Sequence, residues 1–182
     1  MEGDKLIPAH GGYRKLLSYQ NAAIVYDLTV IFCKKYIDRF SRTKDQMEQA
    51  ARSGKQNIAE GSMASGTSKK TELTLVGVAR ASQEELLADY EDFLRQRQLT
   101  QWGKDDLRVR TVRQLSYRSN RTYMTYESYM TQPESAANAL ICLVHQTNYL
   151  LDQQIRALEK QLVEEGGFSE RLYQIRRKRR GY

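Results

Sequence analysis

The residues of this sequence with the clearest chemistry are arginines and lysines that gather in two segments. Five follow one another near the end of the chain, namely Arg176, Arg177, Lys178, Arg179 and Arg180. Segment 103–132 holds a second set, interleaved with tyrosines, which consists of Arg108, Arg110, Arg113, Arg118 and Arg121. Cationic side chains bind phosphate groups, and a tyrosine ring can stack on a base. The two sets therefore predict contacts with RNA or DNA.

The distribution of charge singles out the same two segments. Segment 103–132 has six Lys or Arg residues and three Asp or Glu residues, a net charge of +3. Segment 168–182 has six Lys or Arg residues and one Glu, a net charge of +5. The remaining residues of the chain therefore carry −1 of the total net charge of +7. Two alternatives stay open. The tyrosines of 103–132 could pack inward and leave the arginines in water, and the basic run could be only a solvated tail.

Spacings typical of catalytic and metal sites are missing from the sequence. It has no glycine-rich phosphate loop, no GxSxG, no HExxH and no metal-ligand spacing. We therefore expect a protein that is not an enzyme, with no catalytic residue, metal, cofactor or small-molecule substrate. Cys33 and Cys142 fall on apolar helical stripes and are expected to be buried, reduced thiols. His10 and His145 are expected to be structural or incidental.

The elements that position these residues are predicted to be helices. Pro8 and Pro133 are the only prolines, so about 120 residues between them contain no proline to break a helix. We predict an all-α, up-and-down four-helix bundle whose long antiparallel helices span about 13–40, 44–65, 68–101 and 133–165. The first helix is predicted to turn inward the residues spaced alternately three and four apart: Leu16, Tyr19, Ala23, Tyr26, Val30, Cys33, Ile37 and Phe40.

Several short patterns mark the expected helix ends. Thr43–Gln46 and Thr131–Glu134 have the spacing of capping boxes, and Ser68 is placed as the N-cap of the third helix. The pair Gly166-Gly167 ends the fourth helix, and a short last helix is predicted to follow with Ser169 as its N-cap.

The chain divides into three predicted parts. Residues 1–12 are expected to be a flexible lead-in, and residues 13–167 the bundle. Segment 102–132 is an insertion in that bundle, expected to be a basic helical arm between the third and fourth helices. Residues 168–182 form the basic tail. No apolar run is long enough to span a bilayer and the first residues lack the apolar core of a secretory signal, so we expect a cytoplasmic protein.

The second predicted helix carries an unusual stripe of small residues. The stripe consists of Met47, Ala51, Gly54, Ile58, Gly61 and Ser65. Small side chains let other helices come close, so we expect this helix to be tightly packed. We assign structural or intersubunit roles to Gly54, Asn57, Glu60, Gly61 and Glu72; a polar cluster of Asn57 and Glu60 that contacts a ligand is the open alternative.

The same stretch carries a family resemblance. QMEQAARSGKQNIAEG at 46–61, followed by Ser68, Glu72 and ARASQEEL at 79–86, resembles the small four-helix bundle protein family. That family includes proteins encoded in intervening sequences of large ribosomal RNA, and a relative is the accessory protein of diversity-generating retroelements. The resemblance covers about 13–95 and again 134–165. It implies a basic homopentamer that engages a reverse transcriptase and nucleic acid.

Two functions remain open from the sequence. The first is a non-enzymatic homo-oligomer that binds RNA or DNA through phosphate contacts, as an accessory factor to a reverse transcriptase or in a ribosomal-RNA intervening-sequence context. The second is an oligomeric adaptor or scaffold for a protein partner, without direct contact to nucleic acid.

Overall fold

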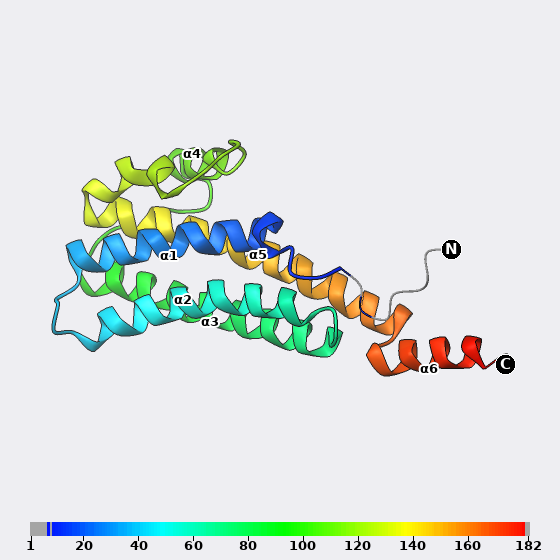
Figure 1. Ribbon diagram of the computed structural model, residues 1–182. Helices are drawn as coiled ribbons and strands as arrows, with labels where there is room; N and C mark the ends of the chain where they lie inside the picture. The colour runs from blue at the N-terminus through cyan, green and yellow to red at the C-terminus, as the bar shows by residue number, and fades with distance from the viewer. Residues whose placement is uncertain (1–6, 8, 181–182) are drawn as a thin grey trace.

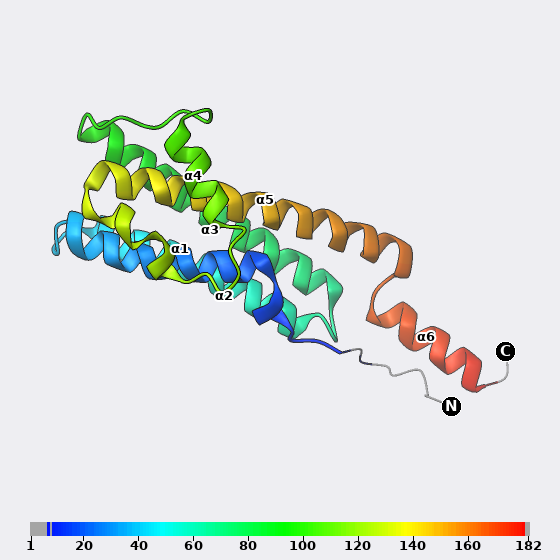
Figure 2. The same cartoon turned by 90° about the horizontal axis from the view of Figure 1, so that it is seen from above.

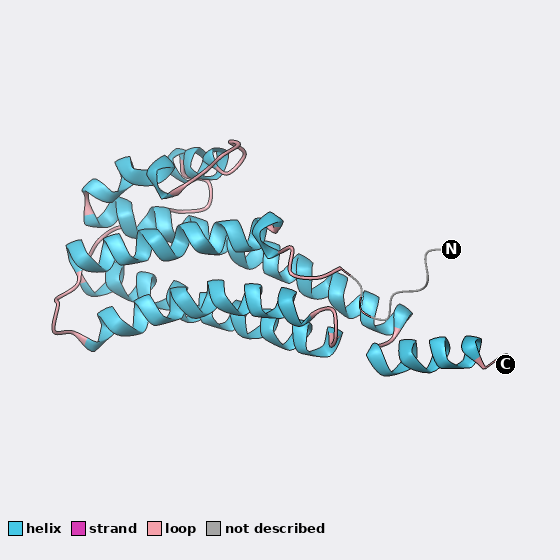
Figure 3. Ribbon diagram, viewed as in Figure 1, coloured by secondary structure: helices cyan, strands magenta, loops and turns pink. Residues whose placement is uncertain are grey.

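The computed structural model describes residue 7 and residues 9–180, and every regular element among them is a helix (Figures 1 and 3). The α-helices are α1 (Leu17–Tyr36), α2 (Arg42–Ala64), α3 (Lys69–Gln96), α4 (Leu107–Leu115), α5 (Pro133–Glu165) and α6 (Phe168–Arg179). Two short 3-10 helices, η1 (Tyr13–Lys15) and η2 (Tyr123–Thr131), complete the chain. The prediction of an all-α protein is confirmed.

Over the described part of the chain, no helix combines the length and the apolar character needed to cross a membrane.

The four long helices α1, α2, α3 and α5 pack side by side, and we call them the helical body (Figure 1). Helices α2 and α5 each contact both α1 and α3. Polar pairs fix the register between helices, because Ser18 donates to Gln154 at 2.8 Å and Ser82 donates to Ser53 at 3.1 Å. In the core, the ring of Phe32 makes edge contacts with Tyr36, Tyr90 and Phe93 at centroid distances of 5.3, 5.0 and 4.8 Å.

The inward face of α1 differs from the predicted stripe. Val30 is 37% exposed and Phe40, beyond the end of α1, is 80% exposed. The buried face instead consists of Ser18, Asn21, Ala22, Ile24, Val25, Leu28, Thr29, Phe32 and Cys33. The reason is that α1 contacts α2, α5 and η2 and so buries a wide arc. Hydroxyl groups can be buried on this face because they are hydrogen-bonded. For example, Thr29 Oγ1 donates to the Val25 carbonyl at 2.7 Å.

Two of the predicted N-caps are wrong by one or two residues and one is confirmed, and the predicted bounds 133–165 of the last long helix match α5. Helix α2 begins after Ser41, whose hydroxyl accepts from the Thr43 amide at 3.2 Å, so the capping box at Thr43 is not formed. The N-cap of α5 is Gln132, because the hydroxyl of Thr131 is directed to the Ser128 carbonyl. Ser68 caps α3 as predicted and accepts from the Thr71 amide at 3.1 Å.

The predicted stripe of small residues on α2 is confirmed. Met47, Ala51, Gly54, Ile58 and Gly61 are all buried, and Ser65 is half-buried. A Cβ atom at Gly54 would collide with the side-chain amide of Gln83 on α3, and one at Gly61 would lie 3.2 Å from the Glu72 carbonyl oxygen. The stripe therefore serves close packing of α2 on α3 within a single chain.

The inserted segment 102–132 does not form an arm. It folds back as α4 and η2, of which α4 packs on α5 and η2 packs on α1 and α5 (Figure 2). The side chains that anchor it are Val109, Val112, Tyr126 and Met130, all buried. Lys35 and Tyr36 on α1 both donate to the Met130 carbonyl, at 3.0 and 2.8 Å. Burial of these apolar residues explains why the segment lies on the helical body.

Residues 9–12, which we predicted to be part of a flexible lead-in, lie against the end of α2. The Gly11 amide donates to the Ser62 carbonyl at 3.1 Å, with Gly11 in the left-handed region at a φ of 80°. Residues 1–6 and 8 of the predicted lead-in lie outside the described residues.

Candidate nucleic-acid interface

Helix α6 lies beyond one end of the helical body, next to the end of α5, which itself extends past the other long helices (Figures 1 and 2). It follows a turn at Gly166, which has a φ of 69°, and the Glu170 carboxylate accepts from the Gly167 amide at 2.9 Å. The start of α6 is therefore fixed by Gly167 and Glu170, and the predicted N-cap Ser169 lies inside the helix.

The basic run of the tail is exposed on α6. The side chains of Arg176, Arg177, Lys178, Arg179 and Arg180 are all exposed, and no residue of α6 is buried. Four successive cations at the end of one short helix point in all directions around its axis, since successive residues are about 100° apart. The end of the molecule thus carries a dense positive charge that can meet phosphates from several sides.

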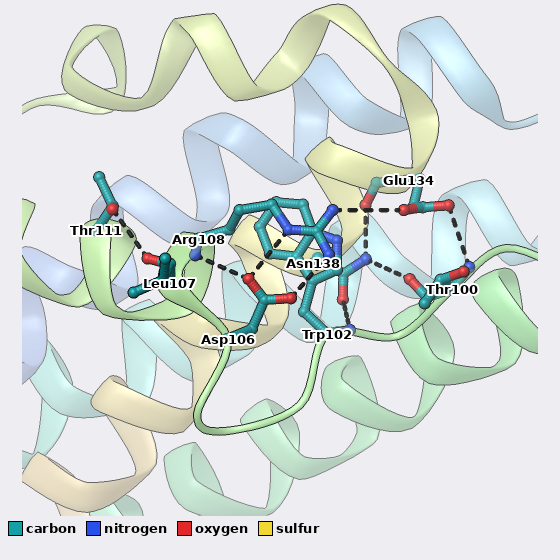
Figure 4. A network of polar contacts seen from close by, with 8 residues as sticks. All are labelled: Thr100, Trp102, Asp106, Leu107, Arg108, Thr111, Glu134 and Asn138. Atoms are coloured by element: carbon teal, nitrogen blue, oxygen red, sulfur yellow. Dashed lines mark hydrogen bonds and ion pairs between the residues drawn. The ribbon is translucent and has the colours of Figure 1, made fainter.

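Arg108, in contrast, is already engaged by neighbours (Figure 4). Its guanidinium donates to both carboxylate oxygens of Asp106, at 3.1 and 2.7 Å, and its Nη1 lies 4.0 Å from Glu134. The same group lies 4.4 Å from the ring centroid of Trp102. Arg108 therefore serves the packing of α4, and we remove it from the nucleic-acid candidates.

Asn138 holds the adjoining loop to α5 (Figure 4). Its buried side chain accepts from the Trp102 amide at 2.7 Å and donates to the carbonyls of Thr100 and Glu134, at 2.8 and 2.9 Å. The Glu134 carboxylate accepts from the Thr100 amide at 3.1 Å. Asn138 was not among the residues predicted from the sequence; its one signal is an amide within the apolar run of residues 136–144.

A cleft of about 410 Å³ opens between α4, α5 and the loop before α4. Its lining includes Lys104, Arg113, Cys142 and His145. Arg113 donates to the Lys104 carbonyl at 3.4 Å, and burial raises the pKa of Cys142 to about 11, so the thiol stays protonated at neutral pH. Arg110 is exposed on the same helix. These cations add positive charge near α4 without a defined ligand geometry.

A second cleft, of about 550 Å³, lies between α1 and the turn that follows α4. We call it the Arg121 cleft and define it by Leu17, Gln20 and Ile24 on one wall and residues 116–121 on the other. Arg118 and Arg121, both predicted from the sequence, come together here. The α1 wall could not be predicted from the sequence, because residues 20 and 120 lie far apart in the chain and their proximity leaves no local pattern.

The five residues predicted to have structural or intersubunit roles lie in different surroundings. Gly54 and Gly61 are buried inside the chain, so the structure uses them for packing between α2 and α3. The Asn57 amide donates to the Ser53 carbonyl and hydroxyl, at 2.9 and 3.0 Å, within its own helix. Glu60 is exposed, and buried Glu72 pairs with Lys69 at 3.2 Å. Asn57 and Glu60 have no shared contact that would support a ligand-binding cluster.

Within the described part of the chain, no three His, Cys, Asp or Glu side chains come together as metal ligands.

No family model, curated protein or solved structure matches this chain, so its membership of the four-helix bundle protein family stays a prediction that rests on the motif at 46–86.

Proposed function

We propose that this protein is a non-enzymatic, homo-oligomeric nucleic-acid-binding protein built on an up-and-down four-helix bundle. The observation that carries the proposal is the position of α6, whose last four residues and C-cap Arg180 form an exposed run of five cations beyond the end of the helical body. Because Lys and Arg release counterions when they meet phosphates, such a helix attracts RNA and DNA with little sequence preference. Arg110, Arg113, Arg118 and Arg121 supply a second, weaker contact.

The partners follow from the same proposal. As in the proteins that the chain resembles, a reverse transcriptase is the expected protein partner, and a pentamer the expected assembly. An exposed face of α3 supports self-association, since Val78, Ala81 and Ala88 are exposed and a Cβ at Gly77 would meet no atom within 4 Å. Native mass spectrometry at micromolar concentration tests the assembly, and a stable 21.1 kDa monomer would contradict it.

The test of the function replaces three tail cations with glutamine. The variant Arg176→Gln, Arg177→Gln, Arg180→Gln should bind single-stranded RNA about tenfold or more weakly at low salt, because three phosphate contacts are lost. The matched control replaces Lys34, Arg42 and Arg52, three exposed cations of α1 and α2, and should stay within about threefold of the unmodified protein. Filter binding measures both, and equal losses in the two variants would contradict a special role for α6.

A second candidate function is an adaptor for an acidic protein. It is favoured by the half-buried residues Phe168, Leu172 and Ile175, whose spacing of four and three places them in one row along α6. Such a row beside five cations suits a groove with an apolar floor and an acidic rim. Absence of binding to any RNA or DNA by the full-length protein at low salt would favour this candidate.

A further inference from the structure

We propose that the Arg121 cleft binds one unpaired nucleotide, which makes the protein selective for single-stranded over duplex nucleic acid. The inference rests on the proposed function and specifies its ligand. It uses a surface of the inserted segment that is separate from α6, so the two can be tested apart.

The first argument is the state of the Arg121 guanidinium. Its Nη1 is shielded from solvent and makes no hydrogen bond to any described residue, although the side chain as a whole is only half-buried. A cationic donor that loses water without gaining an acceptor is costly to the fold. The shielded Nη1 is out of a ligand's reach, but the side chain is half-buried and lines the cleft, so its accessible part can meet an anionic ligand there. A phosphate oxygen is the acceptor that suits a guanidinium best.

The second argument is the chemistry of the two walls. On the α1 wall Leu17, which is 56% exposed, offers an apolar surface beside the nearly buried Ile24. The opposite wall offers the cations Arg118 and Arg121 and the polar side chains Ser116, Ser119 and Asn120. A nucleotide has the same division, with an apolar base face at one end and an anionic phosphate at the other. The volume of about 550 Å³ lies within the range of small-molecule sites.

The third argument is the position of Tyr117. Its ring is 88% exposed, the largest exposure among the large apolar and aromatic side chains of the described residues, and it lies on the rim of the cleft. An exposed tyrosine beside two arginines is the arrangement on which bases of a single strand stack. The ring can therefore hold the base that neighbours the nucleotide in the cleft.

The turn that carries these residues is well anchored. Asn120 adopts a left-handed conformation with a φ of 58°, which asparagine tolerates better than most residues. Before it, the Tyr117 and Arg118 amides donate to the Gln114 and Leu115 carbonyls, each at 3.2 Å. The Ser116 hydroxyl also accepts from Gln146 on α5, at 3.1 Å. The turn is thus held to α5 and faces the α1 wall of the cleft.

Selectivity for single strands follows from access. In a duplex the bases are stacked and paired, so only the phosphates reach a protein surface of this shape, whereas an unpaired base can turn into a cleft. Arg118 and Arg121 would still attract a duplex, but Tyr117 and the apolar wall would not contribute.

The experiment compares a single-stranded RNA of about 12 nucleotides with a duplex of the same length, bound to full-length protein and followed by fluorescence anisotropy. Tyr117→Ala should weaken single-strand binding by about five- to a hundredfold, the range of one base stack, and leave duplex binding within about twofold. Arg121→Gln should weaken single-strand binding more than duplex binding. Arg110→Gln, at an exposed position of α4 outside the cleft, should weaken binding of the single strand and of the duplex by the same factor.

Urea unfolding of the same variants checks that each of them is folded. Because Arg121→Gln removes a charged donor without a partner, its unfolding midpoint in urea should be unchanged or higher. Equal losses on single strand and duplex, or no loss with Tyr117→Ala and Arg121→Gln, would overturn the inference while tail-dependent binding still supported the proposed function. Absence of binding to both ligands by the unmodified protein would overturn the two together.

Discussion

Arg108 and Arg121 lie in the same inserted segment and have opposite surroundings. Arg108 contacts Asp106, Glu134 and the Trp102 ring, whereas Arg121 has a shielded nitrogen without a partner among the described residues. The sequence presents both as basic residues among tyrosines. Asp106, two residues before Arg108, is the sole local hint of the difference. Which arginine is free to bind depends on tertiary contacts, and those are set by helices distant in the chain.

Asp89 shows at the same scale how burial changes chemistry. Burial, and next the carboxylates of Glu85 and Asp92, raise its pKa from 3.8 to about 6. Its Oδ2 is shielded and makes no hydrogen bond to the described residues. The native state therefore binds more protons than the unfolded state between about pH 4 and pH 6, so stability should fall as the pH rises through that interval.

The variant Asp89→Asn tests this prediction. It should raise the free energy of unfolding at pH 7 by about 1 kcal/mol, a value reduced from the full linkage energy because the carboxyl is only partly buried. It should also remove most of the fall in stability between pH 4 and pH 6. Asp27→Asn, at an exposed position of α1, is the control, and urea unfolding measures both. A pH dependence shared by Asp89→Asn and the unmodified protein would contradict the assignment.

Among the helices, the faces that could be predicted from the sequence were those set by the helical repeat alone. The stripe of α2 was predicted in full, since spacings of four and three place Gly54, Ile58 and Gly61 on one face of any helix. The face of α1 was predicted only in part: Cys33 is buried and Leu16, Tyr19, Tyr26 and Ile37 pack against the core, whereas Val30 and Phe40 are exposed. Its neighbours lie on three sides, and buried hydroxyl and amide groups such as Thr29 and Asn21 look like surface residues in a sequence. The fold-back of 102–132 rests on the buried side chains Val109 and Met130, which are too widely spaced to form a recognisable periodic stripe.

The contact between α2 and α3 gives a prediction with a matched control. Gly77→Ala, at a helical position with open space within one subunit, should stabilise the subunit by about 0.5–1 kcal/mol through helix propensity. Gly54→Ala gains the same propensity but collides with fully buried Gln83, so it should be about 1–3 kcal/mol less favourable than Gly77→Ala.

A double-mutant cycle completes the test. Combining Gly54→Ala with Gln83→Ala should recover part of the loss, because the new methyl group then occupies space that the amide has left. Urea unfolding of the four proteins gives the coupling energy. Additive effects, or equal effects of the two glycine substitutions, would show that α3 does not approach Gly54 as closely as described.

In the molecule as a whole, the positive charge is concentrated in two separate segments. The residues outside the two basic segments together carry −1, while segment 103–132 has a net charge of +3 and segment 168–182 one of +5. The sequence located both charged segments, but not their arrangement: one lies folded against α1 and α5, and the other extends beyond the body on α6. Two separate basic surfaces on one subunit, repeated in an oligomer, would contact a nucleic acid at several points.

The central claim, that α6 binds nucleic acid through phosphates, is tested most directly by the salt dependence of binding. Each phosphate contact adds roughly −0.9 to the slope of log K against log salt on duplex DNA, and roughly −0.7 on a single strand. If three to five tail cations engage, truncation after Gly167 should flatten the slope by about two to four units while far-UV circular dichroism shows an intact fold, because α6 buries no residue. A truncated protein with unchanged affinity and unchanged slope would contradict the claim.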